Sequence, residues 1–294
     1  MLSVLEDLKS SHIIKGDERH AYRDPAVLYK DGVFYIYFTL VETEADGTVY
    51  MYTAETRTAD LTNFTPIKKL TVRDRRYNFS SPGNVVFHDG KYKMCLQTYC
   101  RETGEKFGND NSRIFIMESA DLESWDTPYP ILAKGATPLS ELGRMIDPYL
   151  IYEEKADVWH LFYKQNGVSH STSHDLKHFN YEGFIDGGEN VSVIEADGGY
   201  YMFHSPRNGI GVKFSSDLRN WRDVGEPLVF GQSGWPWAMG RLTAGAIVEL
   251  SENGKPLYLM FFHGTGPEDE RVIFDTHAGI GVAWSFDLKN WFWK

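Results

Sequence analysis

A seven-residue motif occurs five times along the 294-residue chain: Ser or Thr, any residue, Asp-Leu, two further residues and an aromatic. The copies read TADLTNF, SADLESW, SHDLKHF, SSDLRNW and SFDLKNW. Their leucines are Leu61, Leu122, Leu176, Leu218 and Leu288, at spacings of 61, 54, 42 and 70 residues. Spacings of this size fit four-stranded propeller blades with loops of variable length. Because Asp and Ser can cap a turn while Leu and the aromatic pack between blades, we interpret the motif as architectural.

Each repeat also opens in the same way, with a short apolar run, a turn and then a strand rich in aromatic residues. The openings are RDPAVLYKDGVFYIYFTL, SSPGNVVFHDGKYKMCLQTY, IDPYLIYEEKADVWHLFYKQ, ENVSVIEADGGYYMFHS and TAGAIVELSENGKPLYLMFFHG. This order of features is a hairpin signal, and the 15% aromatic content favours strands. The sequence therefore predicts an all-β fold, a five-bladed β-propeller of four-stranded antiparallel blades over residues 20–294. Residues 1–19 are predicted to form an N-terminal arm, as a short helix or an extended segment.

Charge and composition exclude several classes of partner. The formal net charge is −11, and no run of Lys or Arg forms a basic stripe, so nucleic acid and anionic membranes are not expected to bind. The first twenty residues contain no continuous apolar stretch, which argues against a signal peptide or anchor. We expect a cytoplasmic protein, or a periplasmic or secreted one if a leader was removed. Cys95 and Cys100 are too few and too close for a disulfide framework. The oligomeric state stays open.

The first strand of each blade lines the central channel of a propeller, and its first residues face one mouth of that channel. These positions are Asp24, Ser81, Asp147, Glu189 and the segment 241–243. Three of them are carboxylates, although the rest of each strand is apolar. Acids that share a pocket repel one another and raise each other's pKa, so such a ring does not stabilise a fold and indicates function instead.

Hydrolysis of a glycosidic bond needs two carboxyl groups with opposite duties. One is protonated and delivers a proton to the leaving oxygen, and the other is ionised and activates water or attacks the anomeric carbon. A third acid can keep the pKa of the proton donor high. Asp24, Asp147 and Glu189 supply this number of groups.

With these residues the chain resembles the five-bladed propeller glycosidases, most closely glycoside hydrolase family 43, which includes arabinanases, arabinofuranosidases and β-xylosidases. The matching segments are YRDPAVL with Asp24, MIDPYL with Asp147 and GGENVSV with Glu189. The resemblance implies an inverting hydrolase of plant or algal oligosaccharides. It makes Asp24 the general base, Glu189 the general acid and Asp147 the group that tunes the pKa of the acid. Acid and base would then lie roughly 6.5 to 9.5 Å apart.

The chain departs from the family pattern in two places. Glu189 is followed by Asn-Val where the family usually has Gly-Pro, and His204 is the alternative acid if Glu189 points elsewhere. The family often has a His at the start of the fifth blade that can hold a central metal ion, but GRLTAGAIV contains none. We therefore predict no cofactor and no metal site, although a central calcium ion is compatible with the resemblance.

Five further residues are predicted to contact a carbohydrate substrate. Arg241 precedes the fifth inner strand and could bind a hydroxyl or carboxylate, or else pair with a surface acid. Trp235 and Trp237 could stack on a sugar ring or be buried between blades. Ser81 stands at a strand start, and His204 ends a second strand.

Two other functions remain open at this point. A glycoside phosphorylase of a related propeller family would need basic groups near the base to hold phosphate, and Arg23, Arg144, Arg207 and Arg241 are candidates. A sugar-binding propeller without catalysis is the second, because propellers host many functions. Retention of all three acids favours catalysis.

Overall fold

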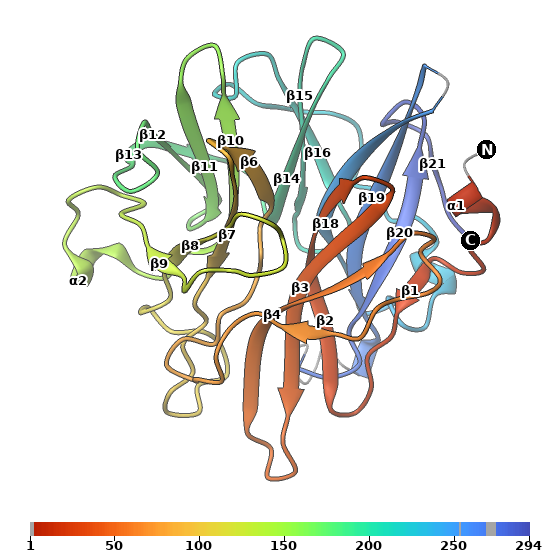
Figure 1. Ribbon diagram of the computed structural model, residues 1–294, viewed down its shortest axis with the longest axis horizontal. Coiled ribbons are helices and arrows are strands. Elements are labelled where there is room, and N and C mark those ends of the chain that lie inside the picture. Colours follow the sequence, from red (N-terminus) through yellow and green to blue (C-terminus); the bar gives the residue numbers. More distant parts are fainter. Residues whose placement is uncertain (1–2, 253, 269–274) are drawn as a thin grey trace.

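The computed structural model describes residues 3–252, 254–268 and 275–294, and it confirms the predicted five-bladed propeller. Each blade is an antiparallel sheet, and in blades 1 to 4 the strands follow in chain order from the axis outward (Figure 1). Blade 1 comprises β2 (His20–Lys30), β3 (Val33–Thr43), β4 (Val49–Thr58) and β5 (Lys68–Lys69). Blade 2 comprises β6 (Val85–His88), β7 (Lys91–Gln97), β8 (Ile114–Ser119) and β9 (Tyr129–Pro130).

Blades 3 and 4 repeat this plan. Blade 3 comprises β10 (Ile146–Glu153), β11 (Val158–Lys164), β12 (Val168–Ser173) and β13 (Asn180–Ile185). Blade 4 comprises β14 (Glu189–Ala196), β15 (Gly199–Ser205), β16 (Gly211–Ser215) and β17 (Arg222–Asp223). The helical pieces are the short α1 (Ser3–Glu6), α2 (Leu139–Leu142) and η1 (Gln232–Gly234), and no helix of the described chain is long and apolar enough to cross a membrane.

Blade 5 is completed by both ends of the chain. Its inner strands are β18 (Arg241–Glu252), β19 (Lys255–Thr265) and β20 (Gly279–Ser285). The outer edge of β20 pairs with β1 (His12–Ile14) along one half and with β21 (Trp291–Phe292) along the other. Ser11 N–H donates to the Lys294 carbonyl oxygen at 3.0 Å, so the two ends lie side by side, as Figure 1 shows. The N-terminal segment thus closes the ring of blades.

The repeated Asp-Leu motif forms the same turn in every blade. In blade 3 the Ser173 hydroxyl accepts hydrogen bonds from the N–H groups of Asp175 and Leu176, both at 3.1 Å. The Asp175 carboxylate accepts from Lys177 and His178 N–H, both at 2.8 Å. The five motif leucines are buried and have φ between 57° and 65°, a left-handed conformation that these hydrogen bonds enforce. The architectural interpretation of the motif is therefore confirmed.

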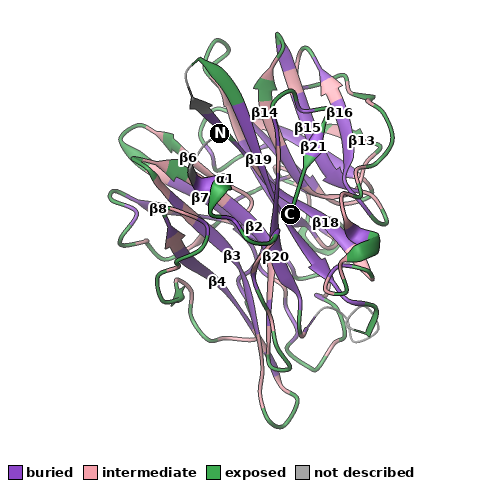
Figure 2. Ribbon diagram, turned by 90° about the vertical axis from the view of Figure 1, so that its right-hand side faces the viewer, coloured by how far each residue is buried: buried purple, intermediate pink, exposed green. Residues whose placement is uncertain are grey.

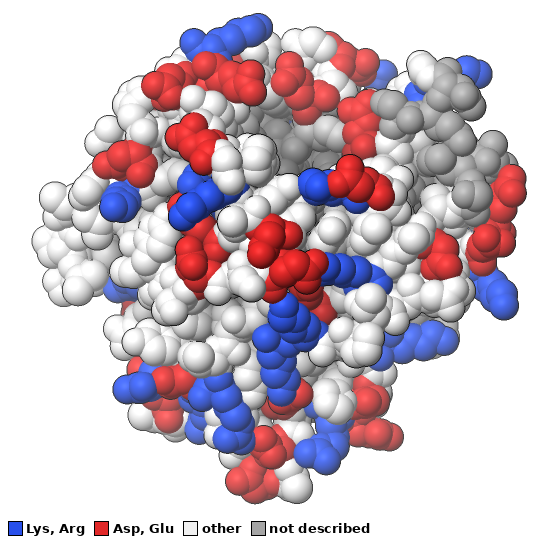
Figure 3. Space-filling view, viewed as in Figure 1, with Lys and Arg blue, Asp and Glu red and all other residues white. Residues whose placement is uncertain are grey.

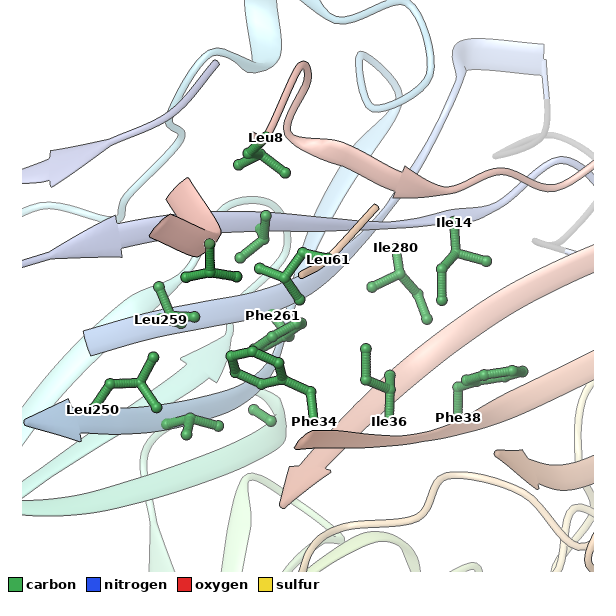
Figure 4. Close-up of a cluster of buried hydrophobic side chains, with 14 of the residues drawn as sticks. Leu8, Ile14, Phe34, Ile36, Phe38, Leu61, Leu250, Leu259, Phe261 and Ile280 are labelled. Carbon is green, nitrogen blue, oxygen red and sulfur yellow. The ribbon is translucent and has the colours of Figure 1, made fainter. Parts of the chain in front are cut away.

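The apolar core lies between the blades. Figure 2 shows that most strand residues are buried, whereas many of the connecting loops are exposed. One cluster joins blades 1 and 5 to the N-terminal segment, with Phe34 and Phe38 facing Phe261 and Ile280 across the blade interface (Figure 4). Leu5 and Leu8 from the N-terminal segment also belong to this cluster. Burial of each such side chain stabilises the fold by about 1.5–3 kcal/mol, so this segment seals the junction where the ring closes.

Candidate active site

The inner strands share an irregularity that directs side chains to the channel mouth. The pairing register of β2 with β3 shifts between Arg23 and Ala26, and that of β10 with β11 shifts between Ile146 and Tyr149. The residues inside these bulges, Asp24 and Asp147, have φ of 51° and 52°. Left-handed backbone is costly for a residue with a Cβ, although Asp and Asn tolerate it better than most. The bulge re-aims each side chain, and such features often mark functional sites.

The same conformation corrects the sequence alignment in blade 4. There the register shifts between Glu189 and Ser192, and the residue with positive φ is Asn190, at 53°. Asn190 therefore occupies the position equivalent to Asp24 and Asp147, and Glu189 precedes it by one residue. Glu189 still lines the pocket. Gly188, before it, packs closely on β15, where a Cβ would be only 1.5 Å from the Ser205 carbonyl oxygen.

The three predicted acids lie in one pocket. Asp24, Asp147 and Glu189 all line a cavity of about 150 Å³ at the mouth of the channel. A smaller cavity of about 10 Å³ lies next to it and shares Asp24, Asp147 and Asn190, with Ser81 also in its wall. Asp24 and Glu189, which are 165 positions apart in the sequence, thus line the same cavity.

Asp24 is buried and held by a network of donors. Thr39 Oγ1 donates to its Oδ2 at 2.7 Å, and Asn190 Nδ2 donates to its Oδ1 at 3.0 Å. Burial by itself would raise the pKa of Asp24, but the Arg23 guanidinium, 4.0 Å away, and these hydrogen bonds hold it below its ordinary value. His263 is neutral near pH 7, because burial lowers its pKa to about 4, and its Nδ1 accepts a hydrogen bond from Asp24 N–H. Asp24 is therefore a carboxylate at neutral pH.

Asp147 has the opposite character. Burial, followed by the charges of Glu189 and Asp24, raises its pKa to about 7. Ser81 Oγ donates to its Oδ1 at 2.8 Å, and the Gln97 side-chain oxygen accepts from its backbone N–H. These contacts fix the carboxyl group but do not offset the loss of water and the repulsion between like charges. Asp147 therefore carries a proton for a substantial fraction of the time near pH 7.

Glu189 is ionised and clamped between two cations. Lys164 Nζ, from the end of β11, contacts one carboxylate oxygen, and Arg241 Nη2, from the start of β18, contacts the other. Burial alone would raise the pKa of Glu189, but Arg241 and then Lys164 outweigh it and lower the pKa below its ordinary value. Asp147 thus differs in protonation from Asp24 and Glu189 because its neighbours differ.

Three of the predicted substrate contacts lie outside the lining of this pocket. The Trp237 ring stacks on His12 with centroids 4.0 Å apart, and Trp235 stacks on Trp237 and Phe262. Both indoles thus cover blade 5 beside the N-terminal segment. His204 is buried, its Nδ1 accepts from Gly188 N–H at 3.0 Å, and burial lowers its pKa to about 4. Arg241 lines the pocket, and Ser81 lines the smaller cavity.

Several lining residues went unrecognised in the sequence. Tyr99, Arg101, Lys106 and Phe107 come from the connection between β7 and β8 of blade 2. Asp275 comes from blade 5, and it pairs with Arg101 at 3.0 Å. Asn190 and His263 also line the pocket. The only signal was the length of the β7–β8 connection, because its residues match nothing in the other blades.

The described part of the chain has no group of three or more His, Cys, Asp or Glu side chains arranged to hold a metal ion. The sequence-based expectation of a site without a cofactor stays a prediction.

Solved structures of similar fold include several glycoside hydrolases. A glycosyl hydrolase from Bacteroides ovatus superposes with a TM-score of 0.67 and 14% identity, over 93% of this chain and 86% of that one. An exo-1,5-α-L-arabinanase from a bovine ruminal metagenomic library gives 0.61 and 16%, over 98% and 99%. A family 43 enzyme from Xanthomonas citri complexed with xylotriose gives 0.58 and 13%, over 96% and 92%. At this identity the likeness establishes the fold. No protein-family model matches the chain, and no curated protein matches it significantly in sequence.

Proposed function

We propose that this protein is a glycoside hydrolase that cleaves plant or algal oligosaccharides with Asp24, Asp147 and Glu189. The observation that carries the proposal is the convergence of three acids with different pKa directions in one pocket at the channel mouth. Pairs of acids whose environments push their pKa values apart supply the base and the acid of glycoside hydrolysis. The fold neighbours support the same chemistry, since one is an arabinanase and another holds xylotriose.

Asp24 is the general base. It is ionised at neutral pH, and the hydrogen bonds from Thr39 and Asn190 fix both of its oxygens. A water placed between Asp24 and the anomeric carbon would give its proton to Asp24 as it attacks. This is the inverting course that the family resemblance implies.

Asp147 is the proton donor. A general acid must hold its proton at working pH, and a pKa of about 7 meets that condition. Glu189 is ionised by Arg241 and Lys164, and its charge keeps the pKa of Asp147 high. This assignment exchanges the roles that the family resemblance implies for Asp147 and Glu189. As the bond between the anomeric carbon and the leaving oxygen breaks, that oxygen takes the proton of Asp147.

Kinetics on a panel of nitrophenyl glycosides and matching unactivated disaccharides test the proposal. We expect Asp24→Asn to lower kcat about 10²–10⁴-fold on every substrate that the wild type cleaves. Asp147→Asn should lower it by a similar factor on disaccharides but far less on nitrophenyl glycosides, because nitrophenolate leaves without a proton. If Glu189→Gln shows this dependence on the leaving group instead, Glu189 is the donor. If wild type turns over no member of the panel, a sugar-binding propeller replaces the proposal.

A further inference from the structure

The pocket is lined by more basic than acidic side chains. Among the described residues, five basic side chains line it, namely Arg23, Arg101, Lys106, Arg144 and Arg241, against four acidic ones, Asp24, Asp147, Glu189 and Asp275. The chain as a whole carries a formal charge of −11, and acids and bases are interspersed on the face shown in Figure 3. A pocket enriched in cations within an acidic protein focuses potential on anionic ligands.

Three of the five cations are beside carboxylates. Arg101 Nη1 contacts both oxygens of Asp275, at 3.1 and 3.0 Å, and Arg241 pairs with Glu189. Arg23 lies 4.0 Å from Asp24. Because Asp147 is partly protonated near pH 7, it offsets the remaining cations only in part.

The other two cations lie beside no carboxylate of the described chain. Arg144 Nη1 donates to the Gly108 carbonyl oxygen at 3.1 Å, and Lys106 lies 5.8 Å from the Phe107 ring centroid. Both contacts are to residues 107–108 of the β7–β8 connection, so Arg144 is tied to the segment that carries Lys106. Arg101 belongs to the same segment, and its Nε donates to the Glu105 carbonyl oxygen at 2.8 Å.

Arg101 is the fixed member of this group. Its side chain is only 9% exposed, and Asp275 and Glu105 engage Nη1 and Nε. No described residue accepts a hydrogen bond from its Nη2, although Arg101 lines the pocket. A guanidinium held in this way presents a preorganised donor, and Arg forks match the oxygens of carboxylate, sulfate and phosphate groups.

We propose that Arg101, Lys106 and Arg144 form an oxyanion subsite of the active-site pocket, so that the enzyme acts on a sugar that carries a carboxylate or other oxyanion, or uses inorganic phosphate. This inference rests on the proposed function. A neutral sugar brings no charge to Arg144 and Lys106, which have no carboxylate partner among the described residues. Phe107, which is half exposed and lines the same wall, offers an apolar face beside the charges for the sugar ring.

The two sources of the oxyanion lead to different balanced reactions. If the sugar carries it, water attacks the anomeric carbon and gives a proton to Asp24, the glycosidic C–O bond breaks, and the released alcohol takes the proton of Asp147. If inorganic phosphate supplies it, an oxygen of hydrogen phosphate forms the new bond to the anomeric carbon, the same C–O bond breaks, the alcohol takes the proton of Asp147, and the proton of the phosphate restores that of Asp147. The products are then a sugar 1-phosphate and an alcohol, with no net oxidation in either case.

Calorimetric titration at constant ionic strength tests the subsite with three probes, namely glucuronate, inorganic phosphate and glucose. We expect wild type to bind glucuronate or phosphate at least about tenfold more tightly than glucose, and Arg144→Met to weaken that binding about 10- to 100-fold. Arg222→Met on the outer strand β17 is the matched control, because Arg222 is exposed and outside the pocket lining, and it should leave binding unchanged. If Arg144→Met fails to fold, as judged by its melting curve, the exposed Lys106→Met replaces it.

The outcomes separate the two proposals. Preference for glucuronate assigns the oxyanion to the sugar, and preference for phosphate, with sugar 1-phosphate among the products, assigns it to a co-substrate. Equal binding of glucose and both anions overturns the subsite, as does an Arg144→Met variant that binds the anion like wild type. Turnover of neutral nitrophenyl glycosides without anion binding refutes the subsite and leaves the glycosidase. Anion binding without turnover of any glycoside, anionic or neutral, supports the subsite and refutes the glycosidase.

Discussion

Replacing Lys164 with methionine removes a positive charge that acts on the acids of the pocket, although Lys164 itself is not part of the pocket lining. Its Nζ contacts Glu189. Its charge lowers the pKa of Asp147 as well as that of Glu189. Methionine keeps most of the length and the apolar stem of lysine, so the variant removes the charge with little change in packing.

The sign and size of the effect follow from the structure. Without Lys164, both carboxyl groups lose a favourable interaction with their ionised forms, so both pKa values rise. An opposite charge in close contact shifts a pKa by about 1–3 units. Lys164 forms its ion pair with Glu189 and not with Asp147, and its side chain is 36% exposed, so distance and solvent screening place the effect on Asp147 at the lower end, about 1 unit. Asp147, the proton donor, would then stay protonated to about one pH unit higher than in the wild type.

The pH dependence of kcat/KM measures this shift. In wild type the alkaline limb should fall near pH 7, where Asp147 loses its proton, and in Lys164→Met it should move up by about one unit. The acid limb, which reports Asp24, should stay in place. Lys155→Met, in the exposed turn of blade 3, is the control and should leave both limbs unchanged. An alkaline limb that stays fixed or moves down in Lys164→Met would refute the assignment of the proton to Asp147.

Three further predictions test other parts of the structure. Asn190→Gly keeps the left-handed backbone but removes the donor to Asp24, so kcat should fall about tenfold and the acid limb of the pH profile should rise. Ser173→Ala removes the hydroxyl that accepts two N–H groups in the blade 3 turn, so chemical denaturation should show a loss of about 1 kcal/mol with kcat unchanged. Asp147→Asn should raise the melting temperature at pH 8 but not at pH 3. At pH 8 the wild type must ionise the buried Asp147, whose pKa is raised to about 7, and this costs stability that asparagine does not cost. Equal melting temperatures of the variant and the wild type at pH 8 would contradict the raised pKa.

The blades were predictable because their signals are local. The Asp-Leu turn needs a hydroxyl, a carboxylate and a leucine at fixed offsets, so the same letters recur wherever the same backbone recurs. The positions of Asp24 and Asp147 were predictable for the same reason, since Asp-Pro marks the bulge in both blades. In blade 4 no Asp-Pro pair marks the bulge. The sequence alignment therefore set Glu189 opposite Asp24 and Asp147, whereas the structurally equivalent residue is Asn190, one position later.

The rest of the pocket depends on contacts between distant segments, which leave no periodic trace in the sequence. Arg101 and Asp275 are 174 residues apart, and neither belongs to a repeated element. The clamp on Glu189 comes from two other blades, so its effect on protonation could not be read from the letters around Glu189. Trp235 and Trp237 illustrate the converse ambiguity, because an indole that packs at a blade edge and one that stacks on a sugar look the same in the sequence.

The cost of the pocket to the fold argues that it is functional. A buried carboxyl whose pKa rises from 3.8 to about 7 destabilises the folded state by about 4 kcal/mol at a pH above both values. The folded protein ionises Asp147 less readily than the unfolded chain does. The loss of stability is therefore absent below about pH 4 and grows as the pH rises to about 7. Left-handed backbone adds about 1–2 kcal/mol of strain at Ser81 and a smaller cost at Asp24, Asp147 and Asn190, because Asp and Asn tolerate it better. Glycine at these four positions would relieve the backbone strain and would remove the polar side chains that meet at the channel mouth. A structural role alone would favour that exchange, so side chains retained at such a cost are better explained by chemistry.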